Sequence, residues 1–283
     1  IDTVPPAQQQ RLGILDGKLY GCGASDMKSG VAVMMVLLER YAQWNFNLVG
    51  LFYDREEGPY DDNGLDGLLD QLGQRAVRLA VVLEPTNNQI QAGCVGSLQA
   101  RAHFRGKRAH SARPWQGDNA IHKAIPLLQR LAERQPHRVV CQGLEFFEVV
   151  TATQALSPGP SNAVPELFSL NLNSRFAPGK SVEDAIGELQ ALVNQEADLE
   201  ILDAAPAGTV QLEDPVLQRW IASEQLQLQP KQAWTDVARL SLRGIPAFNF
   251  GPGDPAQAHQ SDEFVELQAI EENLRLLSAL LQA

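Results

Sequence analysis

Acidic residues and one histidine stand in four short segments that could together bind metal ions. The segments are Ser25–Lys28, Asp54–Gly58, Leu83–Thr86 and Ala258–Ser261. Carboxylate oxygens and imidazole nitrogens are common ligands of zinc and similar divalent cations. Each segment alone has a plainer explanation, with Asp26 as a helix cap, Glu84 as a strand-end residue and His259 as a surface histidine. The adjacent Glu56 and Glu57 are harder to explain, because like charges repel unless a cation or solvent separates them.

Short apolar runs around these segments predict an α/β sheet. Asn47–Tyr53 and Arg78–Leu83 have the composition of buried strands, and Gly30–Trp44 is apolar nearly all round, as in a helix packed on a sheet. Acidic residues follow both predicted strands. Because open α/β sheets bind ligands at the carboxyl ends of their strands, we expect a site at one sheet edge. After Pro206 the same pattern returns, with Asp214 as the expected cap of a helix.

The middle third predicts another order of elements, βαββαβ, which is that of a ferredoxin-like unit. The expected strands and helices are, in order, Leu98–Phe104, Asp118–Glu133, Glu145–Thr151, Leu167–Arg175, Ser181–Asn194 and Leu199–Leu202. Ser181 and Asp118 can cap the two helices, and Pro126 predicts a kink in the first. Alternation along one strand places Arg175 on its polar face. We therefore divide the chain into the first part of a mostly parallel α/β domain (1–97), an inserted unit (98–204) and the domain's second part (205–283).

The composition excludes several classes of partner. The chain has 283 residues and a net charge of −11, so nucleic acid and anionic membrane surfaces would be repelled. Its longest apolar run, near Val31–Leu38, is far shorter than a membrane span. Cys22, Cys94 and Cys141 are too few and too scattered for a disulfide framework, which indicates a cytoplasmic protein. A small anionic substrate would need local basic residues.

Taken in order, the acidic segments resemble one family of enzymes. Gly21–Gly30, Asp54–Gly58, Glu84–Thr86 and the late histidine are similar to the zinc-dependent peptidases and deacylases that include aminoacylases, acetylornithine deacetylase and succinyl-diaminopimelate desuccinylase. The resemblance extends over essentially the whole chain. It implies a catalytic domain with two Zn²⁺ ions, which Co²⁺ or Mn²⁺ could replace. It also implies that the inserted βαββαβ unit is a lid through which two subunits form a homodimer.

The resemblance assigns a role to each residue of the acidic segments. Asp26 would bridge the two metals, Glu84 would complete the first site, and Glu57 with His259 would hold the second. Glu56 would take a proton from water and pass it to the departing amine.

The start of the chain resembles the family's His-x-Asp pattern without its histidine. Asp2, within Ile1–Pro6, would orient that histidine, which would be the missing ligand of the first metal. We therefore expect that the extreme N-terminal part of the catalytic domain is absent. Without that histidine, the first metal site would be weakened.

Segments of the lid resemble those that hold the substrate in this family. His110, in Gly106–Pro114, would reach the partner subunit's site and stabilise an oxyanion there. The residues expected to bind substrate are Arg113, Asn162, Arg175 and Thr235. Arg175 could clamp a carboxylate in bidentate fashion, and Arg239 is a further candidate for contact with an anionic substrate.

Four segments most resemble one branch of the family, the succinyl-diaminopimelate desuccinylases. They are Arg108–Arg113, Gly117–Lys123, Trp234–Arg239 and Phe250–Pro255. The implied reaction cleaves N-succinyl-LL-2,6-diaminopimelate to succinate and LL-2,6-diaminopimelate. Two alternatives stay open: an acetylornithine deacetylase or dipeptidase of the same family, and a non-catalytic relative that uses the βαββαβ unit to dimerise or bind a partner. The presence of Glu56 argues against the second, because a pure binding protein has no use for a base beside the metals.

Overall fold

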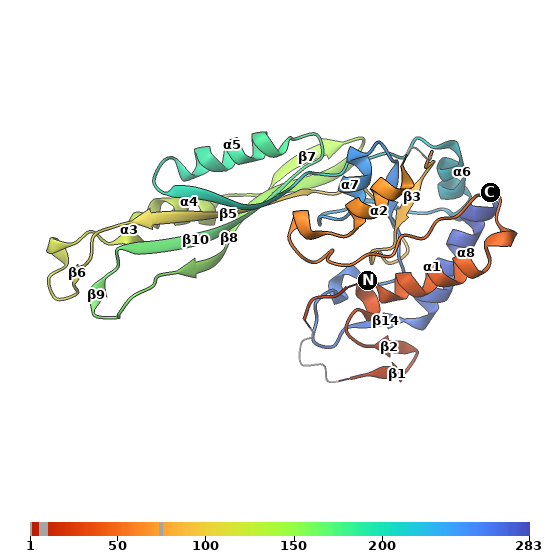
Figure 1. Ribbon diagram of the computed structural model, residues 1–283, viewed down its shortest axis with the longest axis horizontal. Helices are drawn as coiled ribbons and strands as arrows, with labels where there is room; N and C mark the ends of the chain where they lie inside the picture. Colours follow the sequence, from red (N-terminus) through yellow and green to blue (C-terminus); the bar gives the residue numbers. More distant parts are fainter. Residues whose placement is uncertain (1, 6–10, 74–75) are drawn as a thin grey trace. The chain divides into compact units, whose positions relative to one another are not determined.

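The computed structural model describes residues 2–5, 11–73 and 76–283, and it divides the chain into two compact units. Unit 1 comprises Ile1–Cys94, Gly208–Lys231 and Thr235–Ala283. Unit 2 comprises Val95–Ala207 and Gln232–Trp234. Figure 1 shows the strands and helices of each unit.

Unit 1 contains a four-stranded sheet in the order β12-β4-β13-β3. Its strands are β3 (Ala80–Val82), β4 (Ile90–Ala92), β12 (Leu228–Pro230) and β13 (Ala247–Asn249). β12 pairs with β4 and β13 with β3 in parallel, whereas β13 and β4 are antiparallel. The sheet is therefore mixed rather than mostly parallel. A separate antiparallel sheet joins β1 (Gly13–Leu15), β2 (Lys18–Tyr20) and β14 (Phe264–Glu266).

One prediction for the first part of unit 1 is wrong, and a second is confirmed except for the end of the helix. Residues 47–53 form no strand, because no described strand pairs with their backbone, and Val49 and Phe52 are 59% and 42% exposed. The predicted helix Gly30–Trp44 is α1 (Ser29–Glu39), which ends early and is followed by the short turn η2 (Tyr41–Gln43). The composition predicted both features, but a strand also requires a hydrogen-bonded neighbour.

Further helices of unit 1 are η3 (Tyr60–Asp62), α2 (Leu65–Leu72), α6 (Pro215–Glu224), α7 (Val237–Leu242) and α8 (Leu267–Gln282). Asp214 caps α6 as predicted, since its carboxylate accepts the backbone N–H groups of Val216 and Leu217 at 2.7 and 3.1 Å. Trp220 packs against Phe248 and Phe250 in the core. A cavity of about 620 Å³ in this unit is lined largely by apolar side chains, and its lining includes Asp26, Glu56, Glu57 and Glu84.

Unit 2 is built on a five-stranded antiparallel sheet in the order β11-β5-β10-β8-β7. The strands are β5 (Gly96–Arg105), β7 (His137–Cys141), β8 (Leu144–Leu156), β10 (Leu167–Phe176) and β11 (Asp198–Ala205). With α3 (Ala120–Lys123), α4 (Ile125–Glu133) and α5 (Val182–Val193), they follow the predicted βαββαβ order, to which β7 is added at the edge. Two short strands, β6 (Ala109–His110) and β9 (Ala163–Val164), pair with each other, and Figure 1 shows them at one end of this unit.

Alternation along the strands of unit 2 separates an apolar face from a polar one. Leu170 and Leu172 lie in the core with the helices, whereas Asn171 and Arg175 lie on the other face. Ser181 caps α5 as predicted, by accepting the backbone N–H of Asp184 at 3.0 Å. Asn119, not Asp118, caps α3, because its side chain accepts the N–H groups of Ile121 and His122. The helix is interrupted at Ala124, beside the predicted kink at Pro126.

Cys22, Cys94 and Cys141 are free thiols. Across the described part of the chain, no helix has the length and apolar character that a membrane crossing requires.

Candidate metal centre

Three of the predicted metal ligands converge in unit 1, although they are far apart in the sequence. Asp26 lies in the short helical turn η1 (Ala24–Lys28) before α1, and His259 follows the turn η5 (Pro255–Gln257). His259 Nε2 lies 3.4 Å from Glu57 Oε1 and 3.8 Å from Asp26 Oδ2. One ligand atom from each of these residues lies within 4.8 Å of the other two. This spacing suits a shared cation.

The fourth predicted ligand, Glu84, reaches the same group from the end of β3. Its side chain lies close enough to Asp26 to share a hydrogen bond when one of the two carboxyl groups is protonated. Asp26 makes no side-chain capping bond to the helix that follows it. The carboxylate of Asp26 therefore lies between Glu84 and His259, and the simpler interpretation of Asp26 as a helix cap does not hold.

Two glycines let other segments approach the backbone that precedes Glu84. A Cβ on Gly30, in α1, would lie 2.5 Å from the carbonyl oxygen of Leu83, and one on Gly251 would lie 2.4 Å from that of Glu84. Real Cβ atoms do not approach so closely. These glycines therefore allow α1 and the segment after β13 to pack against the end of β3, which brings Asp26 and His259 toward Glu84.

The carboxylates of this group lie close together, and those of Asp26, Glu56 and Glu84 are partly buried, whereas Glu57 is exposed. Burial, then the neighbouring charges of Asp26 and other carboxylates, raises the pKa of Glu84 to about 8, although Lys231 acts in the opposite direction. Burial, then the charges of Glu84, Asp236, Glu57 and Asp26, raises the pKa of Glu56 to about 10. Burial also raises the pKa values of Asp26 and Glu57. Such a group either holds protons or needs a cation, so its carboxylate and imidazole donors fit a divalent metal.

Comparisons with known proteins agree with this geometry. The sequence pattern of the peptidase family M20/M25/M40 matches residues 1–283. The chain belongs to this family. Family M20/M25/M40 consists of peptidases and related enzymes, so the chain is a hydrolase of amide bonds.

Relatives of known name and structure cover nearly all of this M20 chain. A protein of Mycobacterium tuberculosis named as a succinyl-diaminopimelate desuccinylase is 37% identical over 279 residues, which are 98% of this chain and 79% of that protein. The succinyl-diaminopimelate desuccinylase of Corynebacterium glutamicum is 37% identical over 290 residues, or 99% of this chain and 79% of the relative. The M20 metallo-carboxypeptidase Sso-CP2 of Sulfolobus solfataricus has the same fold, with a TM-score of 0.74, 16% identity, and coverage of 99% of this chain and 82% of that one.

Three further residues support the centre of this M20 protein in ways that the sequence did not predict. Glu263 is 3% exposed and accepts the backbone N–H groups of Gly23, Ser25 and Asp26 at 2.8 to 2.9 Å. Lys231 is 6% exposed and donates to the carbonyl oxygen of Pro85 at 3.4 Å. Asp236, which is buried, accepts hydrogen bonds from Tyr53 and Asn63. The chain holds 34 acidic and 23 basic residues, and no local pattern distinguishes these three from surface charges.

Asp2 contacts the turn that carries Glu56 and Glu57. Its carboxylate oxygens accept the backbone N–H groups of Glu56 and Glu57 at 3.2 and 3.4 Å. Asp2 therefore supports the turn that carries the two glutamates.

The residues of unit 2 expected to bind substrate lie in two separate places. His110 and Asn162 are at the β6–β9 end, where Ser111 N donates to Asn162 O at 2.9 Å, and Arg113 follows in the same loop. Arg175 lies at the other end of β10, where its Nε donates to Asn173 Oδ1 at 3.0 Å. Along β10 alone, the two places are about 26 Å apart.

Two residues of unit 1 expected near the substrate are buried. Thr235 is 2% exposed, and its carbonyl oxygen accepts a hydrogen bond from the thiol of Cys94. Arg239 is also 2% exposed and pairs with Asp236 and Asp66. Arg239 is therefore an internal ion-pair residue, and its suggested contact with an anionic substrate is wrong.

Proposed function

We propose that this protein hydrolyses N-succinyl-LL-2,6-diaminopimelate to succinate and LL-2,6-diaminopimelate. The observation that carries the proposal is 37% identity to two desuccinylases over 98% and 99% of the chain. The convergence of Asp26, Glu57 and His259 supports the metal-dependent chemistry that this reaction needs. Membership of a family of amide-bond hydrolases agrees with the reaction class.

Four side chains would hold two Zn²⁺ ions, with Co²⁺ or Mn²⁺ as substitutes. Asp26 would be shared, Glu84 would serve one ion, and Glu57 with His259 would serve the other. The metallo-carboxypeptidase of the same fold supports metal dependence in general, and the mixed carboxylate and imidazole donors favour zinc in particular. Zinc bound here would polarise the amide carbonyl and make water more acidic.

Glu56 would act as the general base and then as the general acid. It is the neighbour of Glu57, and cations bound beside it would lower the raised pKa of its carboxyl, so that the carboxylate could accept a proton and release it again. It would take the proton of the attacking water and give it to the departing amine. Asp2 holds the backbone of both glutamates, so it would orient the base relative to the metal ligand beside it.

Arg175 would bind a carboxylate of the substrate. Its guanidinium is half-buried on the polar face of unit 2, and among the described residues no carboxylate pairs with it. Burial lowers the pKa of this guanidinium, as expected of a cation that lacks a counter-charge. A succinyl carboxylate could fill this role through two parallel hydrogen bonds. Asn162 and Arg113 would add polar contacts beside His110 rather than beside Arg175, and Thr235, which is buried in unit 1, would act on the substrate only through its neighbours.

The protein would act as a homodimer joined through unit 2, which would be a lid. A small substrate cannot span from Arg175 to His110 within one subunit, so His110 would serve the partner subunit's oxyanion. β7 pairs with Leu144–Glu148 of β8, and among the described residues no strand pairs with the rest of that edge of β8. Exposed apolar side chains, Trp115, Ile121, Ile125 and Leu128, lie on or near α3 and α4. An open strand edge beside apolar side chains suits pairing with a second copy.

Hydrolysis assays test the proposal directly. The protein is incubated with N-succinyl-LL-2,6-diaminopimelate, N-acetylornithine and dipeptides, with and without a chelator. We expect succinate release to exceed the other two reactions, to be lost with the chelator and to return with zinc. Faster release of acetate or amino acids would instead assign the acetylornithine deacetylase or dipeptidase alternative. Absence of bound metal together with absence of any hydrolysis would favour a non-catalytic relative.

A further inference from the structure

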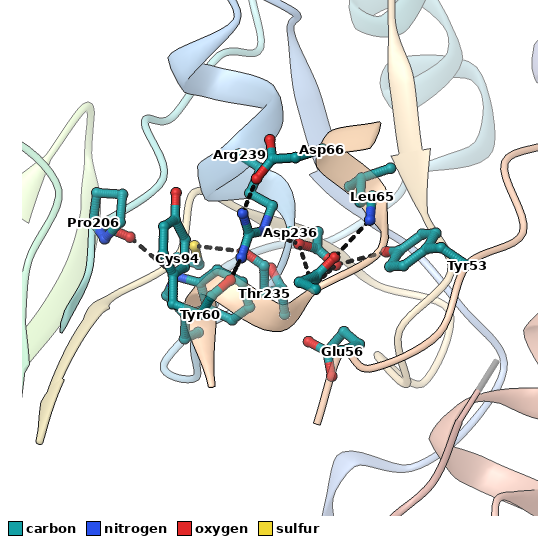
Figure 2. A network of polar contacts seen from close by, with 12 residues as sticks. Tyr53, Glu56, Tyr60, Leu65, Asp66, Cys94, Pro206, Thr235, Asp236 and Arg239 are labelled. Carbon is teal, nitrogen blue, oxygen red and sulfur yellow. Dashed lines mark hydrogen bonds and ion pairs between the residues drawn. The ribbon is translucent and has the colours of Figure 1, made fainter. Parts of the chain in front are cut away.

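Two residues flank the turn that carries Glu56 and Glu57, and both donate hydrogen bonds to one buried carboxylate. Tyr53 Oη donates to Asp236 Oδ2 at 2.7 Å. Asn63 Nδ2 lies 3.1 and 3.2 Å from the two carboxylate oxygens of Asp236. Figure 2 shows Asp236 within this network, with Glu56 nearby but outside the drawn contacts. The segment is thus tied to Asp236 on both sides of the glutamates.

Arg239 holds Asp236 and contacts the same segment. Its Nε lies 3.1 Å from Asp236 Oδ1, and its other nitrogens donate to the carbonyl oxygen of Tyr60 and to the carboxylate of Asp66. The guanidinium carbon also lies 3.7 Å from the centroid of the Tyr60 ring. Both members of the ion pair are almost fully buried, at 1% and 2% exposed. Arg239 therefore fixes the carboxylate of Asp236, which in turn accepts the hydrogen bond of Tyr53.

A backbone hydrogen bond also joins the two ends of the segment between Tyr53 and Asn63. Gly64 N donates to the carbonyl oxygen of Asp54 at 3.0 Å, and Asn63 Oδ1 accepts the N–H of Leu65 at 2.8 Å. Asp236 precedes α7, a position from which a carboxylate commonly caps a helix, yet it makes no such bond. Its hydrogen-bonding capacity is used for the loop instead.

We propose that Asp236, held by Arg239, is a positioning residue that fixes the turn carrying Glu56 and Glu57. The proposal rests on the proposed role of that turn in metal binding and proton transfer. The hydrogen bonds of Asp236 go to the residues that flank the two glutamates, so it acts through Tyr53 and Asn63. Loss of these hydrogen bonds would leave all catalytic side chains in place in the sequence. Glu56 and Glu57 could then move relative to the other proposed ligands.

Two variants and one matched control test this role. Tyr53→Phe removes one hydrogen bond to Asp236 with almost no change in volume, and Asp236→Asn removes the charge while keeping the shape. Arg243→Gln is the control, because Arg243 lies on or beside the same helix and pairs with Asp66 and Asp70 but not with the segment that flanks the turn. Each protein is examined by amide hydrogen exchange of residues 54–58 without metal, by zinc titration, and by kcat and KM for succinate release.

For Tyr53→Phe we expect about fivefold faster exchange in residues 54–58, since one native hydrogen bond is lost. Zinc affinity should fall by about 10-fold. The kcat should fall by about 10-fold with KM unchanged, because Arg175 and the other substrate contacts are intact. Asp236→Asn should have larger effects in the same direction, and Tyr53→Phe decides the question if Asp236→Asn does not fold. The control should lose thermal stability only.

A purely structural role predicts a different result. In that case Tyr53→Phe and Arg243→Gln would both lower the melting temperature and leave exchange, zinc affinity and kcat at their wild-type values, which would overturn the proposal. Exchange and zinc titration need no substrate. If the wild-type protein released no succinate, the proposed function would fail while these two measurements still decided whether Asp236 positions the turn.

Discussion

Glu263 accepts the backbone N–H of Asp26 at 2.9 Å, across a sequence separation of 237 residues. The same carboxylate accepts the N–H groups of Gly23 and Ser25, so three donors of one turn point at one buried acceptor. This contact sets the backbone from which the Asp26 side chain projects toward Glu57 and His259.

We expect Glu263→Gln to weaken zinc binding by about 10- to 100-fold, as is typical when the support of a metal ligand is changed. The amide keeps the length of the side chain but presents an NH₂ group where an acceptor is needed. Zinc titration of the purified variant measures the effect. Asp262→Asn is a matched control, because Asp262 forms only a partly exposed ion pair with Arg11. Equal zinc affinities for both variants would contradict the supporting role of Glu263.

The adjacent glutamates should respond differently to the same substitution. Glu56→Gln is expected to lower kcat by about 10²- to 10⁴-fold, because the general base is removed, while zinc affinity stays within about threefold. Glu57→Gln should lower zinc affinity, because a ligand is neutralised. Steady-state kinetics and zinc titration of both variants separate the two roles. If Glu56→Gln bound zinc poorly and Glu57→Gln bound it normally, the two assignments would have to be exchanged.

The elements of unit 2 could be predicted because its core strands are long and alternate regularly. β5 and β10 each extend the predicted strand by only one or two residues at their ends. The sequence does not predict β7, since most of its residues are exposed and it packs little apolar surface. Residues 47–53 mislead for the opposite reason: they have the composition of a strand, but no described strand pairs with them. An apolar composition indicates that a segment is buried, whereas a strand forms only if another segment lies beside it and pairs with its backbone.

The same difference separates the site residues that could be predicted from those that could not. Asp26, Glu57, Glu84 and His259 lie in short segments of recognisable order, and the structure brings Asp26, Glu57 and His259 together, with Glu84 beside Asp26. Glu263 and Asp236 act by accepting hydrogen bonds from distant segments, so their function depends on tertiary structure alone. Neither the residue type nor the neighbours in the sequence indicate that Glu263 and Asp236 hold the backbone or side chains of distant segments.

Metal-free protein should become less stable as the pH rises. The pKa of Glu84, raised by burial and then by Asp26, is about 8, and that of Glu56, raised by burial and then by Glu84, is about 10, against 4.5 for an ordinary glutamate. Between pH 5 and 8 these groups hold more protons in the folded than in the unfolded state. Each group therefore stabilises the folded protein fully when the pH lies below the ordinary glutamate pKa, and this stabilisation is lost as the pH rises to the raised pKa. The loss is at most about 1.4 kcal/mol per pH unit for each group.

Thermal unfolding between pH 5.5 and 8.5, with a chelator and with zinc, measures this dependence. Zinc favours the deprotonated carboxylates, so it should raise the melting temperature most at the higher pH and flatten the curve. Glu84→Gln in the presence of chelator should also flatten it. A melting temperature that rises with pH in the chelated protein would show that these two carboxyl groups do not control the pH dependence.

Mixing two inactive variants tests whether His110 serves the site of another subunit. His110→Ala removes the imidazole and Glu56→Gln removes the general base. In a dimer of one subunit of each variant, the His110→Ala subunit keeps its own Glu56 and receives the intact imidazole of its partner. One of the two sites would then be complete in half of the dimers, so mixing after reversible dissociation should restore about a quarter of the wild-type kcat. Ile125→Glu, placed among the exposed apolar residues of unit 2, should shift the protein to monomers in sedimentation and prevent the recovery. Were His110 to act within its own subunit, the mixture would be no more active than its components, and the separation of His110 from Arg175 along β10 would need another explanation.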